Sequence, residues 1–201
     1  GALYDQIRPT DVPADILAFW FGLPGEPGFG QPRSEWFRKD AAFDDQIRSR
    51  FLPGVEAALA GQLAAWAAER QGALALLILL DQFPRNLFRG EARAFAGDAQ
   101  ALQLAVTAVG EGWDRPLLAV EKVFVYLPFE HSEALADQER SLTLFAALAA
   151  EHPGCDGFLD YACRHHEVIA RFGRFPHRNA ALGRQSTPEE ASYLAEPGSG
   201  F

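Results

Sequence analysis

The stretch ALALLILLDQF (residues 73–83) decides the fold, because its apolar residues occupy every side of a helix. A helix without a polar face is stable only when other elements surround it, so we expect this stretch to be the central buried helix. Its uninterrupted apolar part, residues 73–80, is much shorter than the roughly 20 residues that cross a membrane. The stretch therefore predicts a globular core rather than a membrane span.

Apolar residues recur at helical spacing on both sides of this stretch, and no segment shows the strict alternation of a half-buried strand. The sequence thus predicts an all-α protein. Gly and Pro residues between positions 23 and 32 indicate a loop, and Pro53-Gly54 should interrupt a helix. The expected helices cover residues 14–21, 34–51, 55–60, 98–109, 117–126, 132–150 and 157–172, followed by a last helix that begins with the capping box TPEE at 187–190.

Length and composition place limits on the function. The 201 residues, 48% of them hydrophobic, can bury one core, so residues 1–201 are expected to form a single domain. The net charge of −9 argues against nucleic-acid binding, which depends on neutralising phosphates with basic residues. No signal peptide is evident, and Cys155 and Cys163 match no zinc or redox motif. We therefore expect a cytoplasmic protein that binds neither nucleic acid nor membrane.

The stretch RFGRFPHRN (residues 171–179) is unusual within this acidic chain. Residues 168–188 contain no Asp or Glu, but they contain four arginines. Gly173 should end the preceding helix in a left-handed conformation, and Phe175 should be extended because it precedes Pro176. A local excess of guanidinium groups, each a fixed fork of donors, favours a small anion as the ligand.

Similar polar clusters follow two other apolar helices. DQFPRNLFRG (81–90), YLPFEHSE (126–133) and RFGRFPHRNAALGR (171–184) each contain an apolar residue, a proline and then polar side chains. If proline ends each helix and successive helices alternate up and down, the three helix ends lie at the same end of the stack. The sequence therefore predicts that the three polar clusters converge on one pocket.

The candidate site residues come from these three clusters and from the helix before the last of them. His and carboxylate side chains can transfer protons near neutral pH, whereas Arg and Asn side chains can hydrogen-bond an anion. The candidate catalytic residues are Asp81, Glu130, His131, His165 and His177, and the candidate ligand-binding residues are Arg85, Asn86, Arg171, Arg174, Arg178 and Asn179. No P-loop, dinucleotide fingerprint or nucleophile elbow is present, and EHSE (130–133) is not a metal motif, so no cofactor or metal is predicted.

Two alternative interpretations of these residues remain open. Some of the arginines could pair with Asp81, Glu130 or Glu133 in a buried network that only fixes the fold. His165 lies on a helical stripe of apolar residues, a position more typical of a buried core histidine than of a ligand.

Several long motifs of the chain are those of a known family. They are ILAFWFG (16–22), Trp36-Phe37, LLDQFPRNLFRG (79–90), AFAGDAQAL (94–102), LPFEHSE (127–133) with Gln138, and HHEVIARFGRFPHRNAALGR (165–184). On these motifs the chain resembles the bacterial family called domain of unknown function 924 over nearly its whole length. The resemblance implies a superhelix of antiparallel helix pairs, similar to tetratricopeptide repeats. It favours one shared site for the polar clusters and implies no reaction.

Our leading expectation is a soluble all-α protein with a pocket for a small phosphorylated or carboxylate metabolite, with catalysis as a further option. The alternative is a repeat-type scaffold that binds a peptide or protein partner in a helical groove. Loss of anion binding on replacing Arg85 or Arg178 would favour the pocket.

Overall fold

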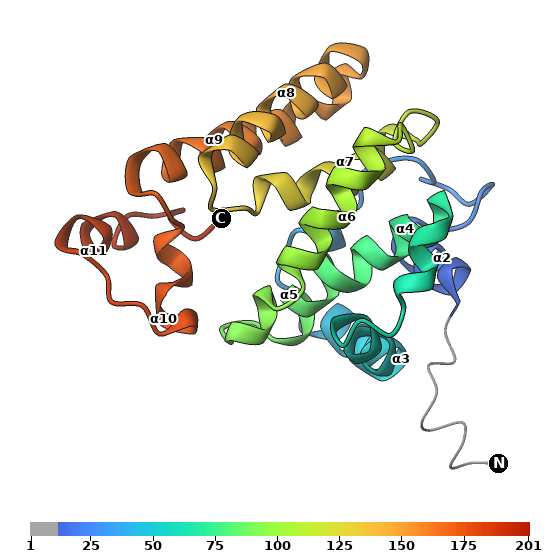
Figure 1. Cartoon of the computed structure of the whole chain (residues 1–201), viewed down its shortest axis with the longest axis horizontal. Coiled ribbons are helices and arrows are strands. Elements are labelled where there is room, and N and C mark those ends of the chain that lie inside the picture. Colours follow the sequence, from blue (N-terminus) through green and yellow to red (C-terminus); the bar gives the residue numbers. More distant parts are fainter. Residues whose placement is uncertain (1–11) are drawn as a thin grey trace. The chain divides into compact units, whose positions relative to one another are not determined.

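The computed structural model describes residues 12–201, and all regular secondary structure within that range is helical (Figure 1). The prediction of an all-α protein is therefore confirmed. The chain forms two compact units. Unit 1 contains the chain up to Arg89 and Arg93–Pro128, and unit 2 contains Gly90–Ala92 and Phe129–Phe201. The organisation of residues 1–201 as a single domain stays a prediction.

The helices of each unit are joined by turns and loops. Unit 1 holds α2 (Pro13–Phe21), α3 (Ala41–Leu59), α4 (Arg70–Leu77), α5 (Phe83–Leu87), α6 (Asp98–Gly110) and most of α7 (Ala119–Glu130), with 3₁₀ turns at Ser34–Trp36, Ala64–Ala68 and Ala92–Phe95. Unit 2 holds α8 (Leu135–Glu151), α9 (Asp156–Phe172), α10 (Asn179–Leu182) and α11 (Pro188–Leu194), with 3₁₀ turns at Pro153–Cys155 and Pro176–Arg178. No helix within residues 12–201 is both long enough and apolar enough to cross a membrane.

The apolar stretch 73–83 lies at the centre of unit 1, as predicted. Residues 72–80 are all buried, and α2, α3 and α6 pack against the helical path that contains them. The path is not one regular helix, because a π-helical turn at Ile78–Gln82 joins α4 to α5. Such a turn widens the helix by one residue and changes the direction of the side chains that follow, here those of α5.

Glycine allows α6 to approach this central path closely. A Cβ atom built on Gly97, just before α6, would overlap with the carbonyl oxygen of Leu80 in the π-helical turn. Backbone atoms cannot move aside as a flexible side chain can, so only glycine fits at this contact. The position of α6 relative to the buried turn thus depends on having glycine, which has no side chain, at position 97.

Aromatic side chains complete the core of unit 1. The ring of Trp20 stacks on Trp36 at a centroid distance of 5.9 Å, and both rings contact Phe124 of α7 edge-on at 5.4 and 4.9 Å. The indole nitrogen of Trp36 donates to the Trp20 carbonyl oxygen at the end of α2. Trp20 and Trp36 are therefore core residues, whereas Phe37 is exposed.

Several predicted helix ends are wrong. Pro53 lies inside α3 and Pro128 inside α7, and Pro84 lies in the first turn of α5, so the helical path continues through all three prolines. Residues 34–51 form a 3₁₀ turn and then the first part of α3 instead of one helix. Ser132 was expected to begin a helix, but α8 begins at Leu135 after Ala134.

Unit 2 is built on an antiparallel pair. Helices α8 and α9 run side by side over their lengths, and α10 and α11 follow at the C-terminal end (Figure 1). Gly173 ends α9 with φ of 73°, and Phe175 is extended before Pro176, so both local predictions for this turn are confirmed. One helix pair does not test the predicted superhelix, and the likeness to tetratricopeptide repeats stays a prediction.

Candidate functional site

His165 is at the centre of a polar cluster in unit 2. It lies on the buried side of α9 with 7% of its surface exposed, in line with Ala162 and Ile169. Its Nδ1 atom is 2.8 Å from the carbonyl oxygen of Tyr161, one turn earlier, and 3.6 Å from a carboxylate oxygen of Glu130. The sequence left two interpretations of His165 open, a buried core histidine and a ligand-binding residue. The side chain is buried, as the first requires, but its neighbours are polar.

These contacts determine the protonation of His165. A carbonyl oxygen can only accept a hydrogen bond, so Nδ1 carries the proton and Nε2 of the neutral ring is an acceptor. Burial, opposed by the bond to Tyr161 and reinforced by the charges of His131, His177 and Arg178, lowers the pKa of His165 to about 3. The ring is therefore neutral at physiological pH, and it is a weak base for proton transfer there.

His165 and its polar neighbours Glu130, His131, His177 and Arg178 form what we call the histidine cluster; the charges of His131, His177 and Arg178 disfavour protonation of His165. The ring centroids of His131 and His165 are 6.3 Å apart. Arg178 is buried, donates to the carbonyl oxygen of His131 at 2.8 Å, and places its guanidinium 4.6 Å from the centre of the Phe175 ring. The cluster contains one carboxylate and several basic groups.

Gln138 of α8 holds the end of α7 against this cluster. It is fully buried, and its amide nitrogen donates to the carbonyl oxygens of Glu130 at 2.6 Å and Ser132 at 2.7 Å. These two acceptors flank His131, so Gln138 fixes the backbone that carries the imidazole. Its role is structural, and only the resemblance to the family had indicated this residue.

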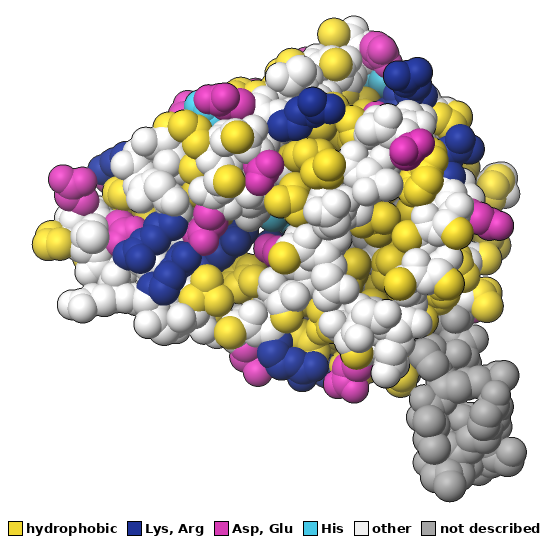
Figure 2. Space-filling view, viewed as in Figure 1, with side chains coloured by type: hydrophobic (Ala, Val, Ile, Leu, Met, Phe, Trp, Pro, Cys, Tyr) yellow, Lys and Arg dark blue, Asp and Glu magenta, His cyan; other side chains and the backbone are white. Residues whose placement is uncertain are grey.

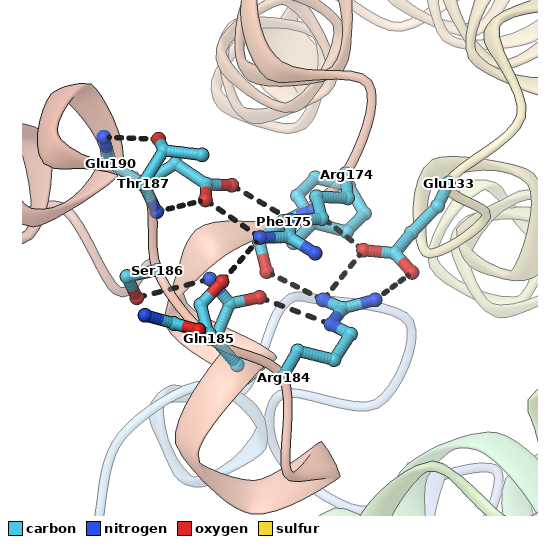
Figure 3. A network of polar contacts seen from close by, with 9 residues as sticks. Glu133, Arg174, Phe175, Arg184, Gln185, Ser186, Thr187 and Glu190 are labelled. Atoms are coloured by element: carbon cyan, nitrogen blue, oxygen red, sulfur yellow. Dashed lines mark hydrogen bonds and ion pairs between the residues drawn. The ribbon is translucent and has the colours of Figure 1, made fainter.

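A second group of contacts, the arginine network, fixes the turn after α9 (Figure 3). Arg174 donates to both carboxylate oxygens of Glu190, at 2.8 and 2.7 Å. Arg184 donates to both oxygens of Glu133, at 2.8 and 3.1 Å, and to the carbonyl oxygen of Phe175. The guanidinium groups of Arg174 and Arg184 thus each form two hydrogen bonds with a carboxylate of the same chain.

The carboxylates of this network are strongly held in the ionised form. Hydrogen bonds from Arg174 and from the Thr187 amide lower the pKa of Glu190 to about 2. Burial opposes the ionisation of Glu133, but hydrogen bonds from Arg184 and from the Phe175 amide outweigh it and lower the pKa of Glu133. Thr187 and Glu190 also form the predicted capping box at the start of α11, which is confirmed.

The other candidates of unit 2 have different surroundings. Asn179 is buried, donates to Ser186 and accepts from Arg184, so it belongs to the arginine network. Arg171 is exposed and lies over the ring of Phe172 at 4.5 Å. Figure 2 shows basic side chains beside acidic ones over the C-terminal helices, the pattern that such ion pairs produce at a surface.

The candidates of unit 1 lie around the π-helical turn. Asp81 is buried within it and accepts a hydrogen bond from Gln82. Arg85 donates to both oxygens of Asp98 at 2.7 and 2.9 Å and to the carbonyl oxygen of Asp81. Asn86 donates to Asp44 of α3 at 2.9 Å. Arg85 also lies 3.6 Å from a carboxylate oxygen of Asp81, which agrees with the interpretation that some arginines pair with buried acids.

The structure thus brings together some predicted residues within each unit. Glu130, His131, His165, His177 and Arg178 lie in one cluster, while Arg174 and Asn179 belong to the adjoining arginine network. Convergence of the unit 1 candidates with those of unit 2 on a single pocket stays a prediction. Glu190 and Arg184 were not among the candidates, and Glu133 was named only as a possible partner in a buried network, because nothing local shows which of many acids pairs with which arginine.

Neither a metal-binding group nor a cavity within the described residues indicates a second candidate site. In residues 12–201 no three His, Cys, Asp or Glu side chains are arranged to hold a metal ion. A cavity of about 660 Å³ in unit 1 is lined by the end of α2, the loop after it and the start of α3. No candidate residue lines it, and Arg38 at its wall is paired with Asp40 at 3.0 Å.

The chain is similar to proteins that are described as having unknown function. A family model described as "Bacterial protein of unknown function (DUF924)" matches residues 16–198, which confirms the resemblance found in the motifs. A solved structure of a protein of unknown function from Agrobacterium tumefaciens is 40% identical to this chain, with a TM-score of 0.79. The similarity covers 91% of this chain and 96% of that one. No curated protein matches the chain.

Proposed function

Because the chain belongs to the bacterial family of unknown function DUF924, we propose a function from its own geometry, namely that the histidine cluster of unit 2 binds a small anion. The observation that supports this is the approach of His131, His177 and Arg178 to the neutral ring of His165, with Glu130 as the carboxylate of the cluster. A partly buried group of basic side chains favours an anionic ligand.

The surroundings of each basic group divide the candidates by role. Arg174 and Arg184 are saturated by carboxylates, so they hold the turn in place. Arg178 donates to the backbone carbonyl oxygen of His131, and its positive charge adds to the field at His165. Arg178 and the imidazoles of His131 and His177 are therefore the proposed ligand contacts.

Binding is favoured over proton transfer as the role of His165. A general acid or base works best when its pKa is near the working pH, and that of His165 is about 3. Its neutral ring still offers Nε2 as an acceptor, for example to a protonated oxygen of a phosphate or carboxylic acid. The five histidines of the chain allow a direct test, since their imidazole signals can be followed separately by NMR.

The experiment is a titration of the full chain with inorganic phosphate at constant ionic strength. We expect saturable changes in the imidazole signals of His131, His165 and His177, and no change in His152, which is exposed at the end of α8. Weak shifts of all five signals in parallel, or none at all, would refute an anion site at the cluster.

A pair of charge-matched variants strengthens the test. Arg178→Gln should weaken phosphate binding about tenfold or more, since a charge-assisted hydrogen bond is lost. Arg171→Gln removes the same charge from an exposed side chain and should leave the affinity unchanged. Equal effects of the two substitutions would mean that net charge, and not the cluster, determines binding.

The alternative function, a scaffold for a peptide or protein partner, differs in its expected results. A partner that binds a helical surface should be insensitive to Arg178→Gln, because Arg178 is buried. The contacts of the histidine cluster described above do not favour that function over anion binding. It stays the second expectation.

A further inference from the structure

Phe201 occupies an aromatic slot beside the histidine cluster. Its ring lies face to face with that of His165, with centroids 3.8 Å apart and an angle of 16° between the planes. Phe175 and His177 meet the same ring edge-on at 6.2 and 5.6 Å. One stacked ring and two edge-on rings therefore surround Phe201, and we call the place that its ring occupies among them the slot.

A cation lies beside the ring that occupies this slot. The guanidinium of Arg164, on α9, lies 5.6 Å from the centre of the Phe201 ring and 5.0 Å from that of Tyr161. A guanidinium at this distance is attracted to the face of an aromatic ring, whichever molecule carries the ring. Phe201 itself is 39% exposed, so the slot is open to solvent on one side.

The segment that carries Phe201 is held to its own helix and not to the slot. Within residues 195–201, Ala195 donates to Ala191, Glu196 to Tyr193, and Ser199 to Leu194, all three acceptors being carbonyl oxygens of α11. Gly198 has φ of 80° in the turn that leads to Phe201. The described contacts of Phe201 with the slot are ring contacts, which another ring can replace at similar free energy.

We propose that the slot between His165, Phe175 and His177 is a subsite for the flat ring of an anionic ligand, and that Phe201 is its displaceable occupant. This inference rests on the proposed anion site and names the class of ligand, an aromatic ring that carries a phosphate or a carboxylate. The ring would stack on His165, and the charged group would face His131, His177 and Arg178. The low pKa of His165 supports the stacking, because the imidazole stays neutral.

The experiment compares two phosphate monoesters that differ only in the ring. Binding of phenyl phosphate and of methyl phosphate is measured by calorimetry on the full chain and on Phe201→Ala. We expect Phe201→Ala to bind phenyl phosphate about three- to tenfold more tightly than the unchanged protein, because the ligand no longer competes with Phe201. Methyl phosphate, which has no ring, should bind both proteins equally.

A control variant separates the slot from general surface effects. Leu135→Ala also removes an exposed apolar side chain of unit 2, from the start of α8, and should change neither affinity. Phe201→Leu keeps an apolar side chain without a flat ring, so it should give a smaller gain for phenyl phosphate than Phe201→Ala.

Each outcome decides one of the two proposals. If methyl phosphate binds but phenyl phosphate gains nothing from Phe201→Ala, the ring subsite is wrong and the anion site stands. If both esters gain equally, Phe201 only covers the anion site, and the ring subsite is again wrong. If neither ester binds to either protein, the anion site itself is refuted.

Discussion

Arg184 donates two hydrogen bonds to Glu133, a residue 51 positions earlier in the chain, at 2.8 and 3.1 Å. The same carboxylate accepts from the backbone amide of Phe175 at 2.6 Å, and the same guanidinium donates to the carbonyl oxygen of Phe175 at 3.0 Å. Both backbone groups of one residue are thus satisfied by one ion pair. Because Phe175 lies under Arg178 and beside His165, this pair positions the histidine cluster.

The first prediction concerns the stability that this pair provides. Glu133→Gln keeps the shape of the side chain but removes the charge that accepts from Arg184 and the Phe175 amide. We expect the free energy of unfolding to fall by about 1.5–3 kcal/mol, the range for hydrogen bonds to a charged group. Urea unfolding at neutral pH measures it. Glu139→Gln, an exposed position on α8, should have almost no effect, and equal losses for both variants would contradict the assigned role of Glu133.

The lowered pKa of Glu133 gives this prediction a pH dependence. A carboxyl group whose pKa is lower in the folded than in the unfolded state contributes stability above its unfolded pKa, near 4.5. That contribution is lost as the pH falls through the folded pKa. The difference between the unchanged protein and Glu133→Gln should therefore be constant near neutral pH and shrink below pH 4.5.

Local rules predicted the parts of this region that depend on neighbouring residues. The capping box at Thr187 and Glu190, the left-handed Gly173 and the extended Phe175 each follow from a few adjacent residues, and all are confirmed. The partners of Arg184 and Arg174 lie 51 and 16 residues away. An arginine can reach any acid that the fold brings near, so sequence spacing alone cannot select these pairs.

The wrongly predicted helix ends have a different cause. Proline inside a helix costs roughly 3 kcal/mol, which led us to expect breaks at Pro53 and Pro128. Buried neighbours outweigh that cost: Leu127 and Phe129 flank Pro128, and Val55 follows Pro53 in the core. Burial of each large apolar side chain contributes roughly 1.5–3 kcal/mol, so tertiary packing determines where these helices end.

The second prediction tests the contact between α6 and the π-helical turn. Gly97→Ala places a methyl group against the carbonyl oxygen of Leu80, and neither backbone can move without disturbing the core. We expect a loss of about 3 kcal/mol or more, at the upper end of overpacking effects. Gly110→Ala, at the other end of the same helix, meets no atom and should be neutral or stabilising by up to about 1 kcal/mol. Thermal unfolding of both variants provides the comparison, and similar melting temperatures would contradict the close approach.

The third prediction concerns the start of α11. The hydroxyl of Thr187 accepts from the backbone amide of Glu190 at 3.1 Å, so Thr187→Ala leaves that amide without its cap. Loss of such a cap costs about 1 kcal/mol. Thr187→Ser retains the hydroxyl and should lose much less. Hydrogen exchange at the amide of Glu190 should become faster in the Ala variant only, and unchanged exchange would show that the cap does not protect the helix start.

The fourth prediction follows from the neutral ring of His165. In the unfolded chain a histidine binds a proton below pH about 6.5, whereas folded His165 does so only near pH 3. Between these values the unfolded state holds one more proton than the folded state at this position. Stability must therefore fall as the pH is lowered through this window, by up to about 1.4 kcal/mol per pH unit from this residue alone.

The variant His165→Asn isolates this contribution, because asparagine can still donate to the Tyr161 carbonyl oxygen but does not titrate. The loss of stability between pH 6.5 and 5, measured by urea unfolding, should be clearly smaller in the variant than in the unchanged protein. This window lies above the range where Glu133 and Glu190 lose their contributions, so those carboxylates do not obscure the difference. If stability falls with pH in parallel for the variant and the unchanged protein, His165 binds its proton equally well in the folded and the unfolded state. The imidazole would then be more exposed to water, and the charge around it less positive, than the geometry of the cluster indicates.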